Sequence, residues 1–244
     1  MIAHVERFAG GRDDSSLDFT KPLPRVLRVE YLTYAIAALL AYLLGSVPTG
    51  YLVGRARGVD IRQTGSGNIG ATNVLRVLGK PAGIAVLIVD SLKGALACWL
   101  IPYMIRQTSL GAGSCKECLE LVAAIGVILG HNYTCWLNFK GGKGIATTGG
   151  VLLALIPAGC GLAVSVWAIT LVITRYVSIA SIMAAISLPF VVWLTGGSRA
   201  LIILVAVLGA LAIFKHKANI KRLLDGTEPR FRAAKSNSAE KSKV

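Results

Sequence analysis

The sequence has few charged residues, few acidic residues and only three histidines. Charged residues make up 16% of the 244 positions, against roughly 25% in a typical soluble domain, and the 26 basic residues outnumber the 12 acidic ones. The histidines are not grouped with cysteines or carboxylates, so no residue cluster indicates a bound metal. We therefore expect neither a metal site nor a cofactor, and the shortage of charge argues against a soluble domain.

Two common catalytic motifs are also missing. No phosphate-binding loop of the G-x-x-x-x-G-K-[ST] type occurs, because Lys143 is followed by Gly144, and no G-x-S-x-G nucleophile elbow is present. Three of the five cysteines lie in apolar runs, where they are expected to pack as small core residues. Cys115 and Cys118 form a lone C-x-x-C, for which unpaired thiols are the favoured interpretation and a disulfide or metal site is the alternative.

What the sequence has in abundance is long apolar runs. Hydrophobic residues make up 54% of the chain, and the mean hydropathy is +0.64. One long run is divided by Pro157 and Gly159, and we interpret it as two helices, because a single helix of that length would overshoot the ~30 Å hydrocarbon core. The segment G-S-V-P-T-G at 45–50 should bend the first helix. The prediction is an all-α integral membrane protein with seven transmembrane helices, at 31–54, 81–105, 119–137, 145–156, 158–174, 177–195 and 200–214.

Basic residues are unevenly divided between the predicted loops. Most lie in the loops after the first, third and fifth spans and in the C-terminal tail, whereas the opposite loops hold Arg106, Lys116 and Arg199. The positive-inside rule therefore predicts a periplasmic N-terminus and a cytoplasmic C-terminus. The net charge of +14 indicates anionic lipid or anionic substrates and not nucleic acid. The predicted division is a polar N-terminal extension at 1–30 without a signal peptide, a membrane domain at 31–230, and a basic disordered tail at 231–244.

The first cytoplasmic loop contains the most polar segment of the membrane domain, T-G-S-G-N-I-G-A-T-N-V-L-R at 64–76. Gly65, Gly67 and Gly70 allow positive φ, and successive N–H groups in such a turn can form an anion-binding nest. Polar side chains that can donate hydrogen bonds to an anion follow in the same segment: Ser66, Asn68, Thr72, Asn73 and Arg76. The segment predicts a phosphate cradle, with a flexible polar loop between helices as the alternative on this evidence alone.

Two further basic segments are predicted on the same membrane face. One is the K-G-G-K turn formed by Lys140, Gly141, Gly142 and Lys143, which is a second candidate anion site. The other is K-H-K-A-N-I-K-R at 215–222, followed by D-G-T-E. If the last helix continues through this segment, His216 and Asn219 share one face. A functional and a purely structural His216 are equally compatible with its position.

The second span contains two charges, Asp90 and Lys93. Buried charges are costly in lipid and usually pair or line a polar cavity. The first interpretation is a structural ion pair, and the second is a contact between Lys93 and substrate.

Taken together, these segments resemble the acyl-phosphate-dependent glycerol-3-phosphate acyltransferase family of bacterial inner membranes, the PlsY family. The matching elements occur in the family order and cover about residues 31–230: G-S-V-P-T-G at 45–50, G-S-G-N-I-G-A-T-N-V-L-R at 65–76, D-S-L-K-G at 90–94, G-H-N-Y at 130–133, F-K-G-G-K-G-I-A-T at 139–147, R-Y-V-S at 175–178 and H-K-A-N-I-K-R-L-L-D-G-T-E at 216–228. The N-terminal extension and the loop that carries the C-x-x-C depart from the family pattern without touching these motifs.

The resemblance implies seven transmembrane helices, a cytoplasmic active site and the transfer of an acyl group from acyl phosphate to glycerol 3-phosphate, giving lysophosphatidate and inorganic phosphate. It places functional roles on Ser66, Arg76, Lys143, His216 and Asn219. The residues expected to bind substrate or phosphate around them are Gly65, Gly67, Asn68, Gly70, Thr72, Asn73, Lys140, Gly141 and Gly142.

An acyl phosphate is already activated, so no covalent enzyme nucleophile is required. The proton acceptor is either the leaving phosphate or His216, and the acyl chain is expected in a groove between helices that opens to membrane lipid. A transporter for an organic phosphate is the competing class, and a non-catalytic lipid-binding scaffold is a third. The polar segments gather at one membrane face, whereas transporters place their sites near the midplane, which favours the enzyme.

Overall fold

The computed structural model describes residues 25–231, so most of the predicted extension and tail, at 1–24 and 232–244, lies outside the described residues. Within this range every regular element is a helix. The elements are α1 (Arg25–Ser46), α2 (Thr49–Ala56), α3 (Ala71–Leu78), α4 (Lys80–Arg106), α5 (Lys116–Asn132), the 3-10 helix η1 (Cys135–Leu137), α6 (Ile145–Leu155), α7 (Pro157–Thr174), α8 (Val177–Leu194), α9 (Arg199–Lys215) and α10 (Lys217–Leu224).

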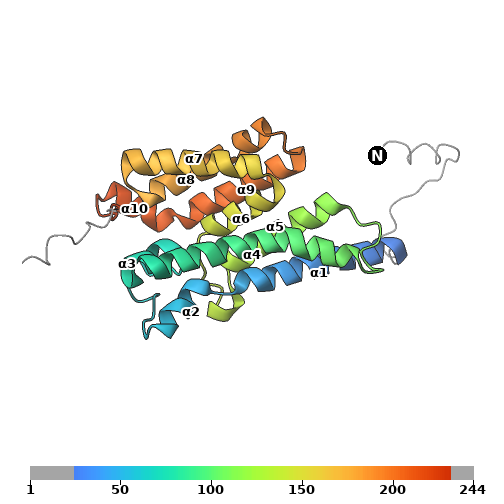
Figure 1. The fold of residues 1–244 in the computed structure, drawn as a ribbon, viewed down its shortest axis with the longest axis horizontal. Helices are drawn as coiled ribbons and strands as arrows, with labels where there is room; N and C mark the ends of the chain where they lie inside the picture. The colour runs from blue at the N-terminus through green and yellow to red at the C-terminus, as the bar shows by residue number, and fades with distance from the viewer. Residues whose placement is uncertain (1–24, 232–244) are drawn as a thin grey trace, which may run out of the picture.

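The long helices form two layers that lie side by side. One layer holds α1, α4 and α5, the other holds α7, α8 and α9, and the short helix α6 lies between them (Figure 1). Small residues allow close packing in the first layer: a Cβ on Gly45 would lie 2.1 Å from the carbonyl oxygen of Val127, so only glycine permits this approach of α1 to α5. The layers therefore meet around α6, which contacts both α4 and α7.

The helices have the length and surface of membrane spans. Five of them are long and apolar enough to cross a bilayer, α9 together with α10 gives a sixth as a bent pair, and α6 is a shorter apolar helix. Large apolar side chains face outward, among them Val172 and Ile173, which are 78% and 76% exposed. In a soluble protein such an apolar surface would promote aggregation, whereas in a bilayer it contacts lipid. The chain is an integral membrane protein, and its described part, residues 25–231, is all-helical.

The breaks between helices agree with the sequence in two places and differ in a third. The 45–50 segment ends α1 at Ser46, and Pro157 begins α7 directly after α6, both as predicted. The last predicted span, 200–214, agrees with α9, but the helix does not continue straight through the basic segment, because α9 ends at Lys215 and α10 leaves it at an angle of 53°. The first helix also begins at Arg25, before the predicted span.

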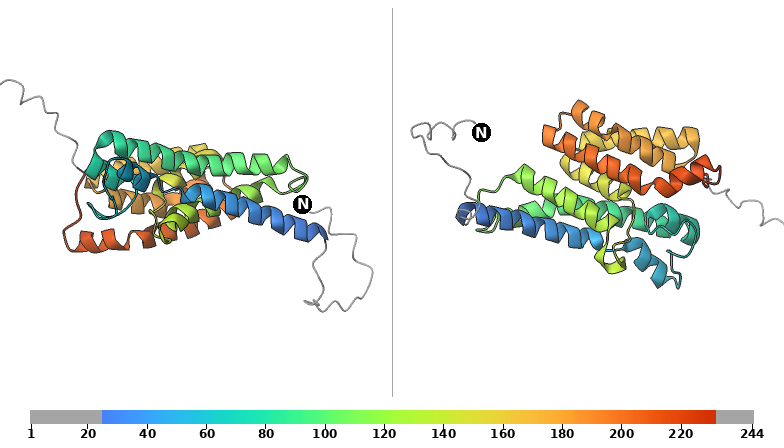
Figure 2. Two further views of the ribbon diagram at one scale, coloured as in Figure 1. Left: turned by 90° about the horizontal axis from the view of Figure 1, so that it is seen from below. Right: turned by 180° about the vertical axis from the view of Figure 1, so that it is seen from behind.

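The three short helices α2, α3 and α10 gather at one end of the molecule (Figures 1 and 2). The opposite end holds the start of α1 and the loop between α4 and α5. Because α2, α3 and α10 border the polar segments of the sequence, that end of the molecule is where a polar site can form.

Candidate active site

A cavity of about 420 Å³ lies where the polar segments meet α6, α7 and α8. Nine of the residues predicted for the site line it: Ser66, Asn68, Gly70, Thr72, Asn73, Arg76, Lys143, His216 and Asn219. Its apolar lining comes from α4 and α6 to α8, with Leu87, Leu152, Val164, Trp167 and Leu188 among its members. Val164 is 55% exposed, so this apolar part is open toward the surroundings of the bundle. The cavity thus joins a cationic pocket to an apolar groove.

The 64–76 loop is shaped by two glycines and one buried asparagine. Gly65 and Gly67 have φ values of +63° and +69°, as the sequence predicts, but Gly70 has φ −75° and forms the N-cap of α3. The Oδ1 atom of Asn73 accepts a hydrogen bond from Ser66 N at 2.8 Å, and its Nδ2 donates to the carbonyl oxygens of Ile61 and Thr64. The side-chain amide of Asn73 therefore forms hydrogen bonds within the loop and stabilises its conformation.

Arg76 lies in the last turn of α3, at the edge of the cavity. Its side chain is exposed, and one terminal nitrogen donates to the carbonyl oxygen of Pro229 at 3.4 Å. Because the guanidinium has five N–H donors, this one long contact to the described part of the chain leaves others available to a ligand in the cavity that Arg76 lines. Arg76 can therefore bind phosphate at the cavity entrance without breaking a buried ion pair.

Lys143 is set into the cavity by the turn that precedes it. Gly141 N and Gly142 N donate to the last carbonyl groups of α5, at 3.2 and 3.0 Å. The ammonium of Lys143 contacts Oδ1 of Asn219. Burial lowers the pKa of Lys143 to about 8, with the nearby carboxylate of Glu228 opposing the shift. An anion entering the cavity would restore the charged form, which makes this lysine a suitable phosphate ligand.

Asn219 links Lys143 to a buried carboxylate. Its Nδ2 donates to Oε1 of Glu228 at 2.7 Å, and Arg222 Nε donates to Oε2 of the same carboxylate at 2.7 Å. Burial alone would raise the pKa of Glu228, but these two hydrogen bonds hold it below its usual value. The charged Glu228 fixes the Asn219 amide so that its oxygen faces Lys143. The sequence contained this residue in its D-G-T-E segment, but nothing there assigned it a role.

His216 lies at the bend between α9 and α10 and is only 3% exposed. Its Nδ1 is 2.7 Å from the carbonyl oxygen of Ala212, and since a carbonyl only accepts, Nδ1 carries the proton. In the neutral ring Nε2 is then an acceptor. The bend that ends α9 thus gives the cavity a histidine of fixed tautomer.

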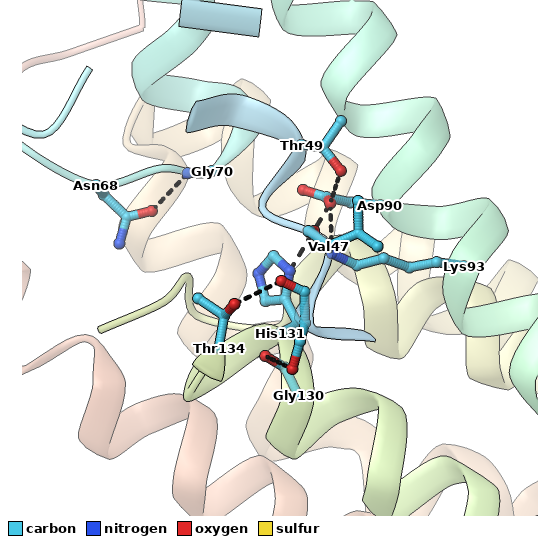
Figure 3. Close-up of polar contacts among 10 residues, drawn as sticks. Val47, Thr49, Asn68, Gly70, Asp90, Lys93, Gly130, His131 and Thr134 are labelled. Atoms are coloured by element: carbon cyan, nitrogen blue, oxygen red, sulfur yellow. Dashed lines mark hydrogen bonds and ion pairs between the residues drawn. The ribbon is translucent and has the colours of Figure 1, made fainter. Parts of the chain in front are cut away.

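Asp90, which also lines the cavity, forms a buried ion pair with Lys93 (Figure 3). Lys93 Nζ is 2.8 Å from Asp90 Oδ1, which confirms the pair predicted from the sequence. Thr49 donates to the same oxygen at 3.0 Å, and His131 Nδ1 lies 3.8 Å from it. Sequence reasoning did not connect His131 with Asp90, because they are 41 positions apart on different helices.

Not every residue predicted to bind phosphate lines the cavity. Lys140 is exposed and lies outside the lining, as do the four glycines at 65, 67, 141 and 142. The glycines instead shape the two loops that carry the lining side chains. Conversely, Ser178 and Ser181 of α8 line the cavity although no role was predicted for either, even though Ser178 ends the matching R-Y-V-S segment. Within the described residues, no group of three or more metal-ligating side chains occurs.

Comparison with known proteins identifies the family to which the chain belongs. A family model described as glycerol-3-phosphate acyltransferase matches residues 35–226. This chain belongs to the glycerol-3-phosphate acyltransferase family. Curated members from Geotalea daltonii and Synechococcus sp. are 48% and 43% identical to it over 79% and 82% of this chain, and the matches cover 94% and 95% of those proteins. The resemblance seen in the motifs is thereby confirmed, and so is the assignment to the acyltransferases.

Two solved structures share the fold. The crystal structure of PlsY (YgiH), an integral membrane glycerol 3-phosphate acyltransferase, in its glycerol 3-phosphate form matches with a TM-score of 0.72 and 39% identity. The match covers 82% of this chain and 96% of that chain. The lysophosphatidic acid form of the same protein matches with a TM-score of 0.70. Both structures therefore support the description of this acyltransferase as an integral membrane protein.

Proposed function

We propose that this acyltransferase uses acyl phosphate as its donor and releases 1-acyl-glycerol 3-phosphate, that is lysophosphatidate, and inorganic phosphate. The observation that carries the proposal is the single cavity that joins Arg76, Lys143 and His216 to an apolar groove. Both proposed substrates carry a phosphate group, and one of them also carries a long acyl chain. The cationic part of the cavity can bind the two phosphate groups, and the apolar groove that continues from it can hold the acyl chain.

The two phosphates are assigned to two sources of positive charge. Arg76 offers a guanidinium, the first turn of α3 offers backbone N–H groups and the Thr72 hydroxyl, and the loop before α3 offers the Ser66 hydroxyl. Lys143 offers an ammonium on the other wall, next to Asn219. These groups would bind both phosphates, neutralise them and orient the reacting atoms, without a dedicated cation.

The reaction needs no covalent intermediate on the protein. The 1-hydroxyl of glycerol 3-phosphate attacks the acyl carbonyl, a new C–O bond forms, and the bond to the phosphate oxygen breaks. The departing phosphate takes the hydroxyl proton, so the substrate supplies its own base. His216, whose Nε2 is an acceptor, would orient the hydroxyl together with Asn219. His216 as general base is the alternative route for the same proton.

The same site suggests an orientation in the bacterial inner membrane. Seven passes follow if α6 and α9 each cross, with an extracytoplasmic N-terminus and a cytoplasmic C-terminus. The polar end of the molecule holds most of the basic residues, which by the positive-inside rule would face the cytoplasm. Acyl chains would then enter from the lipid side past Val164 and Leu87, while glycerol 3-phosphate would enter from the cytoplasm.

The donor can be tested directly. Purified full-length protein would be incubated with labelled glycerol 3-phosphate and one of three donors: acyl phosphate, acyl-coenzyme A, or acylated carrier protein. We expect labelled lysophosphatidate and stoichiometric inorganic phosphate with acyl phosphate alone. Product formation from a thioester donor in the absence of acyl phosphate would contradict the proposal, although the assignment to the acyltransferase family would stand.

A further inference from the structure

The K-G-G-K turn that carries Lys143 is seated directly on His131. A Cβ added to Gly142 would lie 2.1 Å from Nε2 of His131, so the imidazole edge touches the backbone of the turn. Gly142 N also donates to the backbone oxygen of His131 at 3.0 Å. The position of this ring therefore limits how far the turn can move toward α5.

The ring is in turn supported from the opposite side by Asp90. Nδ1 of His131 is 3.8 Å from Asp90 Oδ1, and the two side chains are 5% and 3% exposed. Asp90 cannot move easily, because Lys93 and Thr49 both contact the same carboxylate oxygen. Lys93 also donates to the backbone oxygen of Val47, at the break between α1 and α2 (Figure 3). The carboxylate of Asp90, held in place by Lys93 and Thr49, thus lies on the side of the His131 ring opposite the turn.

We propose that His131, supported by Asp90, is a positioning residue that sets the location of the Lys143 ammonium in the cavity. The proposal rests on the proposed role of Lys143 in binding phosphate. Lys143 directly follows Gly142, so a shift of the turn moves the start of its side chain. The Lys143 ammonium must contact both Asn219 and the bound phosphate. A change of side-chain rotamer can therefore compensate little for a shift of the backbone.

A purely structural histidine is the competing explanation, and a double-mutant cycle separates the two. Binding of glycerol 3-phosphate and of inorganic phosphate would be measured on the purified full chain without acyl donor. For the ligand that Lys143→Ala weakens, we expect His131→Ala to weaken binding on the order of 10-fold in the native background and hardly at all in the Lys143→Ala background. The thermal midpoint of each variant would be recorded to normalise for folded protein.

Equal losses in both backgrounds would overturn the proposal, because a structural defect does not depend on Lys143. If Lys143→Ala weakens neither ligand, both this inference and the assignment of Lys143 fail, while the donor test described above is unaffected. If Lys143→Ala weakens binding and His131→Ala does not, this inference alone fails.

A matched pair of glycine variants tests the contact itself. Gly142→Ala places a methyl against the ring, whereas Gly161→Ala on α7 meets nothing within 4 Å. We expect Gly142→Ala to weaken phosphate binding roughly 10-fold and Gly161→Ala to stay within about two-fold. Adding His131→Ala to Gly142→Ala should cause no further loss, because the vacated ring volume accepts the methyl. Fully additive losses in the double variant would contradict the contact.

The contribution of Asp90 requires a paired change, since Asp90→Asn alone leaves Lys93 as an unpaired buried charge. Asp90→Asn combined with Lys93→Met removes both charges and keeps similar side-chain volumes. We expect this protein to fold and to bind the Lys143-dependent ligand several-fold more weakly, with kcat at saturation changed less than KM. Native affinity in the folded double variant would show that Asp90 does not support the ring.

Discussion

The ammonium of Lys143 contacts the amide oxygen of Asn219, although the two residues are 76 positions apart in the chain. The other end of the same amide donates to Glu228 at 2.7 Å. Because Glu228 accepts from the amide nitrogen, the amide oxygen must face Lys143 and cannot turn away. The contact joins the turn that carries Lys143 to α10 and the segment that follows it, so the Asn219 side chain fixes the Lys143 side of the cationic pocket.

The first prediction concerns this link. Asn219→Ala removes the partner of Lys143 and one hydrogen bond to Glu228, so we expect kcat/KM to fall roughly 10- to 150-fold, as for a lost charge-assisted hydrogen bond. Thr227→Ala serves as a neighbouring control, because its hydroxyl makes only an exposed 3.4 Å contact with Arg222 O. Steady-state kinetics on both purified variants would decide, and equal activity in the two would count against a role for Asn219.

The second prediction is a pH dependence. The buried Lys143 has a pKa of about 8, below its usual 10.5, so its charge is present below pH 8 and is lost as the pH rises through that value. Phosphate monoesters lose their second proton at about pH 6, so the phosphate of glycerol 3-phosphate stays dianionic as the pH rises through 8. We expect kcat/KM to decline on the alkaline side with a midpoint near 8, and the decline to move to higher pH in Lys143→Arg. A profile that is flat to pH 9.5 in the native protein would contradict the lowered pKa of Lys143.

Much of the fold could be predicted from the sequence, because bilayers impose simple constraints on length and polarity. Apolar runs located the long helices, and Pro157 correctly divided the longest run. The bend at His216 was missed, since nothing in K-H-K-A-N-I-K-R breaks a helix locally. The bend is accompanied by a tertiary contact that has no local sequence signal: Asn219 of α10 contacts Lys143, which lies 76 positions earlier in the chain.

The site was predicted less completely, for a related reason. Glycine-rich loops and isolated cations stand out in an apolar chain, and the cavity brings Ser66, Arg76 and Lys143 together as expected. Residues that act on one another across helices leave no local pattern, which is why His131 and Glu228 received no role. Asn73 shows the opposite error, because it was taken as a ligand donor and the structure uses its amide within the loop.

The third prediction compares the two sides of the phosphate cradle. Arg76→Ala removes a guanidinium at the cavity edge, and we expect kcat/KM to fall roughly 10- to 150-fold. Arg76→Lys should recover only part of this loss, because an ammonium cannot form the bidentate contact. Ser66→Ala removes one neutral donor and should cost less than Arg76→Ala. Kinetics with varied glycerol 3-phosphate would test the order, and near-native values for both Arg76→Ala and Lys143→Ala would remove the phosphate-cradle interpretation.

The fourth prediction is topological. Lys140 is exposed and does not line the cavity, so a Lys140→Cys variant reports on the polar end of the molecule without changing the site. An impermeant thiol reagent should label it only after the membrane is opened. The exposed native Cys115 and Cys118, at the other end, should react in intact spheroplasts unless they form a disulfide. Labelling of Lys140→Cys from outside would contradict the seven-pass orientation.

The last prediction separates the two routes for the proton. His216 donates through Nδ1 to the carbonyl oxygen of Ala212, so its Nε2 can either orient the substrate hydroxyl or remove its proton. His216→Gln keeps a polar side chain of similar reach but cannot accept a proton at neutral pH. If the departing phosphate is the base, the variant should retain measurable turnover with a raised KM for glycerol 3-phosphate.

If His216 is the base, kcat should instead fall by about 10²- to 10⁴-fold with KM little changed. Binding of glycerol 3-phosphate without donor provides the control, because a misplaced glutamine would weaken binding in both cases. His216→Ala distinguishes the cases further: loss of orientation alone should make it worse than His216→Gln, whereas loss of a base should make the two variants equally slow. Equal kcat in these variants, far below the native value, would therefore assign the proton to His216 and overturn the substrate-assisted route.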